Sequence, residues 1–232
     1  MQRVSITTLE KFSRYMNEVS SFDTEESLIE SIKGLFLGND KTKFGSAYHK
    51  LLEGDVKVTG KGLQVTADNE IFVFALPVAK PALDYKKAFP LMVQEMNLRH
   101  IYNTNHFPIQ ISGRLDGING AHVRDAKCKF RTPDWREYME SCQWKFYLDI
   151  LGLQNFYYDV FEIKGFTELP KGKPYIIKDV TVIPHEPLEC ISYPFMHEEL
   201  VQLIDSFLEY VQMKGLLQYL KPALPMENEL TF

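Results

Sequence analysis

Cysteine is scarce in this 232-residue chain, and its three cysteines, Cys128, Cys142 and Cys190, are widely spaced and form no C-x-x-C pair. Three isolated cysteines provide neither a disulfide framework nor the paired ligands of a structural zinc site. No apolar run is long enough to cross a bilayer, and residues 1–12 lack the apolar stretch of a secretory signal. We therefore expect a cytoplasmic protein without zinc fingers, disulfides or membrane spans.

Excess positive charge is also absent, because the formal net charge is −5 at pH 7. A protein with this balance has no global attraction for nucleic acid, so any surface that binds DNA must be local. Basic residues gather in two places, around residues 41–50 and 124–136. Each cluster, taken alone, is also typical of a solvated face.

Hydrophobic residues are plentiful at 45% of the chain, enough to bury a large core. We expect one α/β domain over residues 1–232, with a core at about 41–183. Helices within 6–36 and 194–220 would pack on this core, and the tail 222–232 would be loose. Periodicity and turn residues predict helices at 6–19, 24–36, 45–53, 133–151 and 194–219, strands at 91–102, 109–118, 121–129, 156–164 and 175–183, and a hairpin or loop at 56–66. Residues 68–90 are ambiguous, since Asp68 could cap a helix through Phe74, but Pro77 and Pro81 would break any helix that continued past it.

The segment ISGRLDGINGAHVRDAKCK, residues 111–129, reads as a β-hairpin. Asn119-Gly120 is a strong signal for a type I′ turn, and a two-residue loop there would place Asp116 opposite Val123 and Arg114 opposite Asp125. In that register Asp116, Asp125 and Lys127 share one face of the hairpin. The two aspartates would be diagonal neighbours with Cβ atoms about 7 Å apart.

Two carboxylates at this spacing can converge on one cation, and Mg²⁺ prefers such oxygen ligands while keeping several waters. Lys127 could then orient or deprotonate a water or hold a phosphate, and Arg114 could hold a phosphate oxygen. The alternative is a surface hairpin with an ion pair between Arg114 and Asp125. The D/E-x-K triplet alone decides nothing, because Lys57, Lys86 and Lys164 end similar triplets.

Two pairs of residues four positions apart fall on predicted helices. His49 and Glu53 would share one helix face and present an imidazole and a carboxylate to one place. Gln143 and Tyr147 have the same spacing on the helix that comes after the hairpin. Taken alone, the first pair is typical of a surface and the second of a polar edge beside a core aromatic.

The order of these features resembles the PD-(D/E)XK nuclease superfamily, in particular its RecB-like branch and the phage-type recombination exonucleases, lambda exonuclease and exonuclease VIII. The resemblance spans about residues 44–152 and rests on FGSAYHKLLE, GRLDGI, VRDAKCK and the spaced Gln143 and Tyr147. It implies a restriction-endonuclease-like core with a central mixed sheet flanked by helices. The nominal proline before Asp116 is replaced by Leu115, and no iron–sulfur cysteines are present.

The resemblance also implies roles for individual residues. Metal ligands would be His49, Asp116, Asp125 and the carbonyl of Ala126, with Glu53 a weaker candidate. Lys127 would be the catalytic lysine, while Gln143 and Tyr147 would support the site or DNA. The hairpin and the basic cluster around residues 124–136, rather than the resemblance, predict that Arg114, Lys129 and Arg131 bind nucleic acid.

The function predicted on this basis is Mg²⁺- or Mn²⁺-dependent cleavage of DNA, with no iron–sulfur cluster. By likeness, the enzyme would be an exonuclease on double-stranded DNA ends in phage-type recombination, with a single-strand annealing protein as partner, and it could form homo-oligomers. Two alternatives remain: a structure-selective or restriction-like endonuclease on the same core, and an inactive nucleic-acid-binding or scaffold protein.

Overall fold

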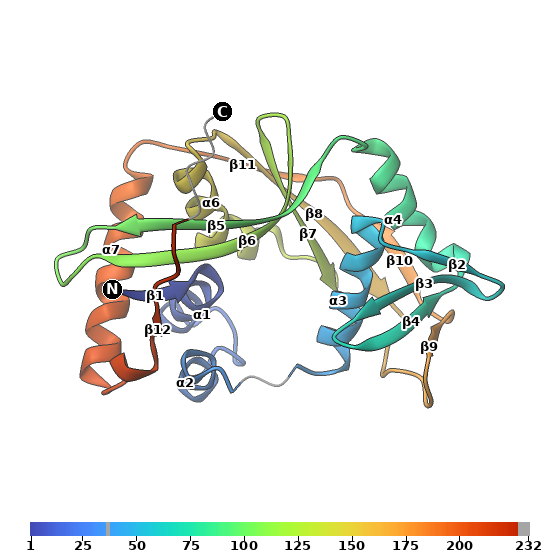
Figure 1. The fold of residues 1–232 in the computed structure, drawn as a ribbon, viewed down its shortest axis with the longest axis horizontal. Coiled ribbons are helices and arrows are strands. Elements are labelled where there is room, and N and C mark those ends of the chain that lie inside the picture. Colours follow the sequence, from blue (N-terminus) through green and yellow to red (C-terminus); the bar gives the residue numbers. More distant parts are fainter. Residues whose placement is uncertain (36–37, 227–232) are drawn as a thin grey trace.

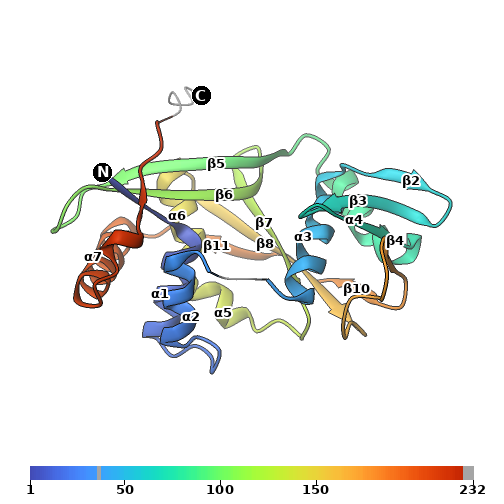
Figure 2. The ribbon, with the colours of Figure 1, turned by 60° about the horizontal axis from the view of Figure 1, so that its bottom comes forward.

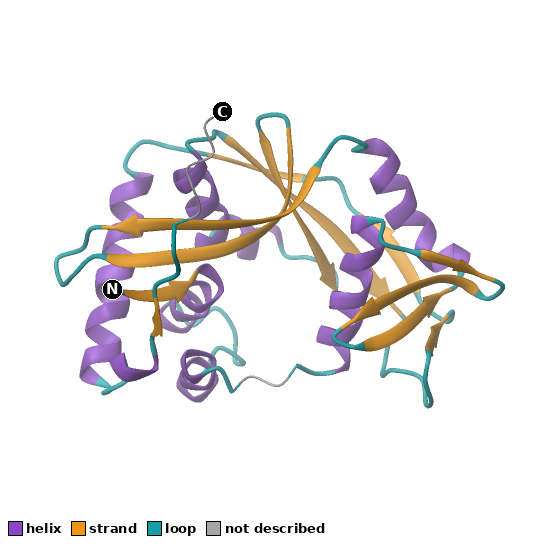
Figure 3. Ribbon diagram, in the orientation of Figure 1, coloured by secondary structure: helices purple, strands orange, loops and turns teal. Residues whose placement is uncertain are grey.

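A mixed eight-stranded sheet runs through the middle of the molecule, and helices flank it (Figures 1 and 3). The computed structural model describes residues 1–35 and 38–226. The architecture is the α/β fold with a central mixed sheet that the sequence predicts, and it is consistent with a restriction-endonuclease-like core. No helix within the described ranges is both long and apolar enough to span a membrane.

The large sheet has the strand order β10-β8-β7-β6-β1-β12, with β5 paired to β6 and β11 paired to β8. Its strands are β1 Gln2–Ser5, β5 Val93–Tyr102, β6 Ile109–Asn119, β7 His122–Lys129, β8 Asn155–Lys164, β10 Thr181–Pro184, β11 Leu188–Ile191 and β12 Lys221–Pro222. The β5-β6-β7 part is an antiparallel meander, whereas β7 pairs with β8 in parallel. A smaller sheet contains β2 Lys57–Thr59, β3 Gly62–Ala67, β4 Glu70–Phe74 and β9 Tyr175–Ile177.

The helices are α1 Ile6–Met16, α2 Glu25–Lys33, α3 Asp40–Glu53, α4 Leu76–Ala88, α5 Trp135–Met139, α6 Cys142–Leu151 and α7 Met196–Met213, with the short 3₁₀ helix η1 Leu217–Tyr219 after them. In Figure 2, α1, α6 and α7 lie under one end of the large sheet, whereas α3 and α4 lie beside the small sheet at the other end. This division reflects two separate groups of buried side chains.

The first hydrophobic cluster joins α1, α6 and α7 to the large sheet, with Phe12, Leu115, Phe146, Phe156 and Phe207 among its members. The second hydrophobic cluster joins α3 and α4 to the small sheet and the far end of β8, with Phe44, Tyr48, Phe74, Phe161 and Ile163 among its members. Strand β8 contributes to both, because alternate side chains point to opposite faces of a sheet. The two ends of the molecule are therefore held together through the strands that cross its centre.

Several predicted boundaries were wrong. Residues 70–74 form strand β4, and Asp68 lies in the preceding turn with Asn69, both with positive φ (49° and 62°), as a type I′ hairpin turn requires. Pro77 and Pro81 both lie within α4. Pro77 falls in the first turn, where a backbone N–H has no partner inside the helix, and this position tolerates proline.

Two predicted elements are each divided into two in the structure, and part of the tail predicted to be loose is held by hydrogen bonds. The stretch predicted as one strand at 175–183 is divided between β9 and β10, which belong to different sheets, and the helix predicted at 133–151 is divided into α5 and α6 at Ser141, the N-cap of α6. Within the predicted loose tail, Pro222 pairs with Gln2 in β12, and Gln110 exchanges two hydrogen bonds with the backbone of Leu224. Residues 36 and 227–232 of these predictions lie outside the described residues.

The β6–β7 hairpin turns one residue later than predicted. Asn119 pairs with His122 and Ile118 with Val123, so the turn is Gly120-Ala121 rather than Asn119-Gly120. Gly120 has φ +63° and Ala121 is not among the residues with positive φ, which is the pattern of a type II′ turn. The predicted register is thus wrong by two residues, and because the side-chain repeat in a strand is two, the shift leaves each residue on its predicted face.

Candidate active site

Strands β6 and β7 separate soon after their turn. Their ladder ends at Gly117 and Arg124; beyond it β6 continues beside β5 and β1, whereas β7 continues beside β8. Asp116 and Asp125 are the next residues on the two strands, at the point of separation. The backbone N–H of Ala126, which β6 no longer reaches, donates a 2.8 Å hydrogen bond to Asp116 Oδ2. The Asp116 side chain therefore bridges the two strands where the ladder ends.

Asp125 is buried, with only 1% of its surface exposed. Its Oδ2 lies 2.6 Å from Lys127 Nζ, and its Oδ1 accepts a 3.4 Å hydrogen bond from Gln143 Nε2. Burial raises the pKa of Asp125 to about 6, although the Lys127 ammonium opposes the shift. Burial would lower the pKa of Lys127, but Asp125 and Asp116 outweigh it and raise that pKa. Lys127 therefore keeps its charge at neutral pH.

His49 reaches the same place from α3, and its Nδ1 lies 3.5 Å from Asp116 Oδ2. Burial, with help from the nearby Lys127 ammonium, lowers the pKa of His49 to about 4, so its imidazole is neutral at pH 7 and able to bind a metal. The preceding residue, Tyr48, is fully buried in the second hydrophobic cluster and donates a hydrogen bond to the Val78 carbonyl. Packing of α3 in that cluster thus determines where His49 points.

Glu53, one turn beyond His49, lines the same cavity, and its Oε2 lies 2.5 Å from Lys50 Nζ. This carboxylate therefore has a cationic partner on its own helix, as Asp125 has on its own strand.

Gln143 and Tyr147 on α6 are both brought to the site. Besides its bond to Asp125, Gln143 Nε2 donates to the Tyr147 hydroxyl over 3.4 Å, and that hydroxyl donates to the Arg114 carbonyl over 2.8 Å. Gly113 makes this approach possible, since a Cβ there would lie 2.8 Å from the Tyr147 ring. The expected pair therefore connects β6 to Asp125 through hydrogen bonds.

Glu10 positions α6, and the sequence interpretation missed it. Its Oε2 accepts hydrogen bonds from the Ser141 hydroxyl at 2.9 Å and from the Cys142 N–H at 2.8 Å. The carboxylate of α1 thus caps the N-terminus of α6, where backbone N–H groups lack partners within the helix. No local sequence signal could reveal a contact between residues so far apart in the chain.

Glu95 is a second acidic residue that was missed. The β5–β6 register places it across from Asp116, and it has φ +61°, an uncommon conformation for a residue with a side chain. Its carboxylate forms an ion pair with Arg114. The alternative pairing of Arg114 with Asp125 is therefore not formed. Once the strand at 91–102 was predicted, the register of its hairpin with 109–118 could have indicated Glu95.

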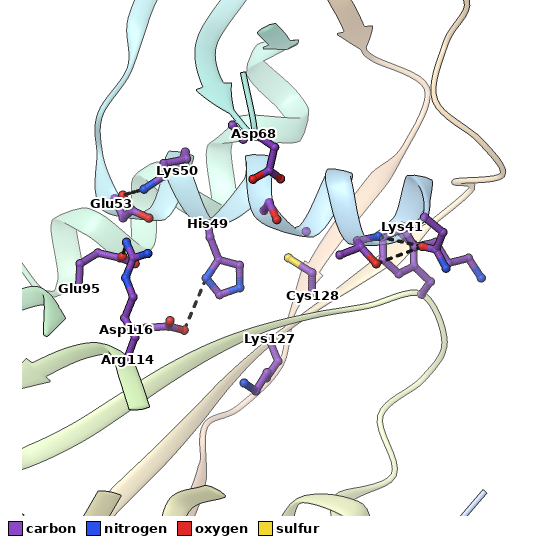
Figure 4. Close-up of a pocket in the computed structure, with 16 residues that line it drawn as sticks. Lys41, His49, Lys50, Glu53, Asp68, Glu95, Arg114, Asp116, Lys127 and Cys128 are labelled. Carbon is purple, nitrogen blue, oxygen red and sulfur yellow. Dashed lines mark hydrogen bonds and ion pairs between the residues drawn. The ribbon is translucent and has the colours of Figure 1, made fainter. Parts of the chain in front are cut away.

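Part of the site lines a cavity of about 640 Å³ between α3 and strands β5, β6 and β7 (Figure 4), whereas Asp125, Gln143 and Tyr147 are not among the residues that line it. His49, Glu53, Glu95, Arg114, Asp116 and Lys127 all line it. Lys129 and Arg131, which the basic cluster of the sequence predicts to bind nucleic acid, are not among the lining residues. Lys129 lies over the Tyr138 ring, and Arg131 forms an ion pair with Glu137.

Arg124, a member of the basic cluster at 124–136, is directed into the protein instead. Its guanidinium donates bidentate hydrogen bonds of 2.6 and 2.8 Å to Asp159, and Tyr85 donates a further 2.8 Å bond to the same carboxylate. Only 6% of Arg124 is exposed. Arg124 therefore forms a buried ion pair on the face of β7 opposite Asp125 and is not part of an exposed basic surface.

The donor set suits a divalent cation, although part of it is already engaged. A neutral imidazole and two carboxylates are ligands that Mn²⁺ and Mg²⁺ accept, although the buried Oδ2 of Asp125 is paired with the Lys127 ammonium at 2.6 Å. Among the described residues, no group of three or more His, Cys, Asp or Glu side chains is arranged to enclose a metal ion. In this arrangement the Lys127 ammonium provides the positive charge beside Asp125.

Comparisons with known proteins support the fold. No protein-family model matches the sequence, and none of the curated proteins matches it. A solved structure from Eubacterium rectale, named "Putative exonuclease", is similar over 99% of this chain and 91% of its own, with a TM-score of 0.50 and 10% identity. The structure of SSO0001 is similar over 90% of this chain and 76% of its own, with a TM-score of 0.45 and 14% identity. At 10% identity the likeness to the Eubacterium rectale protein concerns the fold alone.

Proposed function

We propose that this protein is a metal-dependent deoxyribonuclease. The observation that carries the proposal is the convergence of His49, Asp116 and Lys127 at one cavity, from one helix and two diverging strands, with the buried Asp125 held 2.6 Å from the Lys127 ammonium. The likeness of the whole fold to the Eubacterium rectale protein named "Putative exonuclease" supports it. We further propose that the enzyme is an exonuclease that acts on double-stranded DNA ends in phage-type recombination, with a single-strand annealing protein as its partner.

Each group would have a defined task. Asp116, Asp125 and the imidazole of His49 would hold Mg²⁺ or Mn²⁺, with the carbonyl of Ala126 as a further ligand and Glu53 nearby. The bound cation would supply a lowered pKa for a coordinated water and would neutralise charge on the phosphate. Because Lys127 stays protonated, it would orient the attacking water or hold a phosphate oxygen rather than remove a proton.

The remaining residues would position these groups. Gln143 would hold Asp125 in place by its hydrogen bond, and Tyr147 would hold the Arg114 backbone. The Arg114 side chain, more than half exposed at the cavity, would exchange its ion pair with Glu95 for a phosphate oxygen.

Cleavage of linear duplex and supercoiled circular DNA with Mn²⁺ tests the proposal. We expect the linear DNA to be degraded from its ends and the circle to stay intact, whereas an Asp116→Asn variant should leave both intact. Nicking of the circle would instead indicate an endonuclease. If neither DNA changed under conditions of saturated binding, and an RNA strand also stayed intact, the protein would be a binding or scaffold protein.

A further inference from the structure

The cavity changes in character along helix α3 (Figure 4). Around the C-terminal half of the helix it is lined by the imidazole of His49 and the carboxylates of Glu53, Glu95 and Asp116. Around the N-terminal half, α3 itself presents Lys41, Gly45 and Ser46 to the cavity and no carboxylate, whereas Asp68 in the β3–β4 turn adds one carboxylate to the lining beside the middle of the helix. Asp40 also belongs to this half, but it accepts a hydrogen bond from the Leu169 N–H and does not line the cavity.

Lys41 is the cation that α3 offers in this half. Its Nζ lies 5.6 Å from the centre of the Phe130 ring, at the cavity wall, and within the described ranges no carboxylate pairs with it. Lys43 differs, because its Nζ lies 3.1 Å from Glu70 and it does not line the cavity. Lys41 is therefore a cation of this wall that forms no ion pair within the described part of the chain.

Gly45 occupies the middle of this wall, one helical turn before His49. Glycine is among the least favourable residues in a helix interior, yet nothing in the protein requires it here. Its φ is not positive, and a Cβ built on it would meet no atom within 4 Å. By contrast, a Cβ on Gly113 or Gly117 would come within 2.5 Å of Ile6 or Met92, so internal packing excludes side chains there. The open space next to the Gly45 Cα is therefore part of the cavity and is not filled by other side chains.

We propose that the N-terminal half of the cavity binds the sugar–phosphate backbone of one nucleic-acid strand, which passes directly in front of Gly45 toward the reacting phosphate. Lys41 and the Ser46 hydroxyl contact its phosphate groups. This inference rests on the proposed nuclease function, because it locates the substrate relative to His49 and Asp116.

The dimensions of the cavity favour one strand over a duplex. A volume of about 640 Å³ is that of an ordinary small-ligand pocket, which holds a short length of one strand. With a rise of about 1.5 Å per residue, the stretch of wall from Asn39 to His49 is about 15 Å long. A strand that follows this wall to His49 therefore includes nucleotides beyond the reacting phosphate. A duplex would have to open before its strand entered. This path would explain why residue 45 is a glycine, since any side chain there would occupy the space through which the strand passes.

Filling the path tests the proposal. Gly45→Ala and Gly45→Gln place a small and a long side chain in the cavity, and both residues are good helix formers. The matched controls are Gly60→Ala and Gly60→Gln, because Gly60 also has open space around it and lies outside the cavity, in the β2–β3 turn. All are compared by thermal unfolding, Mn²⁺ binding and cleavage of linear DNA. Affinity for a fluorescent single-stranded oligonucleotide is measured in an Asp116→Asn background that prevents cleavage.

We expect Gly45→Gln to weaken oligonucleotide binding at least tenfold and to slow cleavage, with Gly45→Ala intermediate. Both should unfold at the same or a higher temperature than the parent and keep its Mn²⁺ affinity. Binding and cleavage unchanged by Gly45→Gln would overturn the strand path. Failure of the parent protein to cleave DNA or RNA, with oligonucleotide binding still sensitive to Gly45→Gln, would overturn the nuclease function and leave the strand path standing.

Charge provides a second test of the same path. Lys41→Ala should weaken oligonucleotide binding and reduce the slope of log Kd against log salt by about one, as expected for one lost phosphate contact. Lys57→Ala, on β2 outside the cavity, is the control and should change neither. Equal salt slopes for Lys41→Ala and Lys57→Ala would contradict a phosphate contact at Lys41.

Discussion

The two hydrophobic clusters differ in what they do for the site that lies between them. The first holds the strands on which Asp116, Asp125 and Lys127 lie, and the second holds helix α3 with His49. Strand β7 shows the boundary. One face of β7 carries Val123, which belongs to the first cluster, followed by Asp125 and Lys127 of the site. The other face carries Ala126, which belongs to the second cluster.

The difference shows two ways in which a protein positions functional groups. The carboxylates and the lysine occupy one face of a local hairpin, so short-range register places them near one another. The histidine depends on the packing of an entire helix against a different set of side chains. Changes in the two regions should therefore disturb different properties of the protein.

The largest effect should come from the hairpin. Lys127→Ala or Asp116→Ala should reduce the rate of DNA cleavage on the order of 10²–10³-fold, because the first removes a cation beside the reacting phosphate and the second removes a ligand of the proposed metal. Single-turnover rates on linear DNA with saturating Mn²⁺ measure this. Lys57→Ala and Lys86→Ala, which end two of the other D/E-x-K triplets, should change the rate little. An equal loss from Lys86→Ala would show that the wrong triplet was chosen.

Removing one buried ring from each cluster compares the two regions directly. Phe12→Ala in the first cluster and Tyr48→Ala in the second should each lower the free energy of unfolding by about 3–5 kcal/mol, since both rings are fully buried. Tyr48→Ala alone should also weaken Mn²⁺ binding, because it loosens the helix that carries His49. Urea unfolding and titration calorimetry measure the two quantities. Equal loss of Mn²⁺ affinity in both variants would remove the distinction between the regions.

His49→Ala isolates the contribution of α3 to the proposed metal site. We expect Mn²⁺ affinity to fall on the order of 10–100-fold. The preference for Mn²⁺ over Mg²⁺ should fall with it, because an imidazole ligand favours Mn²⁺. His106→Ala is the control, since His106 contacts Glu209 and does not line the cavity. Unchanged Mn²⁺ affinity in His49→Ala would exclude His49 as a ligand.

The smallest effect concerns pH. Since the pKa of Asp125 is raised to about 6, protons compete with the cation below that pH. Mn²⁺ affinity should be constant above about pH 7 and fall below pH 6 as Asp125 takes up a proton, with Asp116, whose pKa burial also raises, adding to the loss. His49→Ala should keep this dependence, because the lowered pKa of His49 places its titration near pH 4. Affinity that stayed constant from pH 7 to 5 would contradict the role of Asp125.

Much of the fold was predictable from local patterns. The meander β5-β6-β7, helix α6 and strand β8 have clear periodicity. The face of the hairpin on which each residue lies was predicted correctly, because the register error was two residues, the same as the side-chain repeat of a strand. Residues 68–90 stayed ambiguous, since Pro77 and Pro81, considered locally, argue against the helix that tertiary packing stabilises. The long-range contacts of Glu10 with α6 and of Arg124 with Asp159 have no local signal.

Local residue order was enough to place Asp116, Asp125 and Lys127 on one face, because strand alternation and a tight turn act over a few residues. It also placed Gln143 and Tyr147 on one side of a helix. The distance from His49 to Asp116, the presence of Glu95 in the cavity and the open wall at Gly45 depend on how α3 is held against diverging strands. Those features arise from burial of the second hydrophobic cluster, whose contacts join residues far apart in the chain and therefore exist only in the folded molecule.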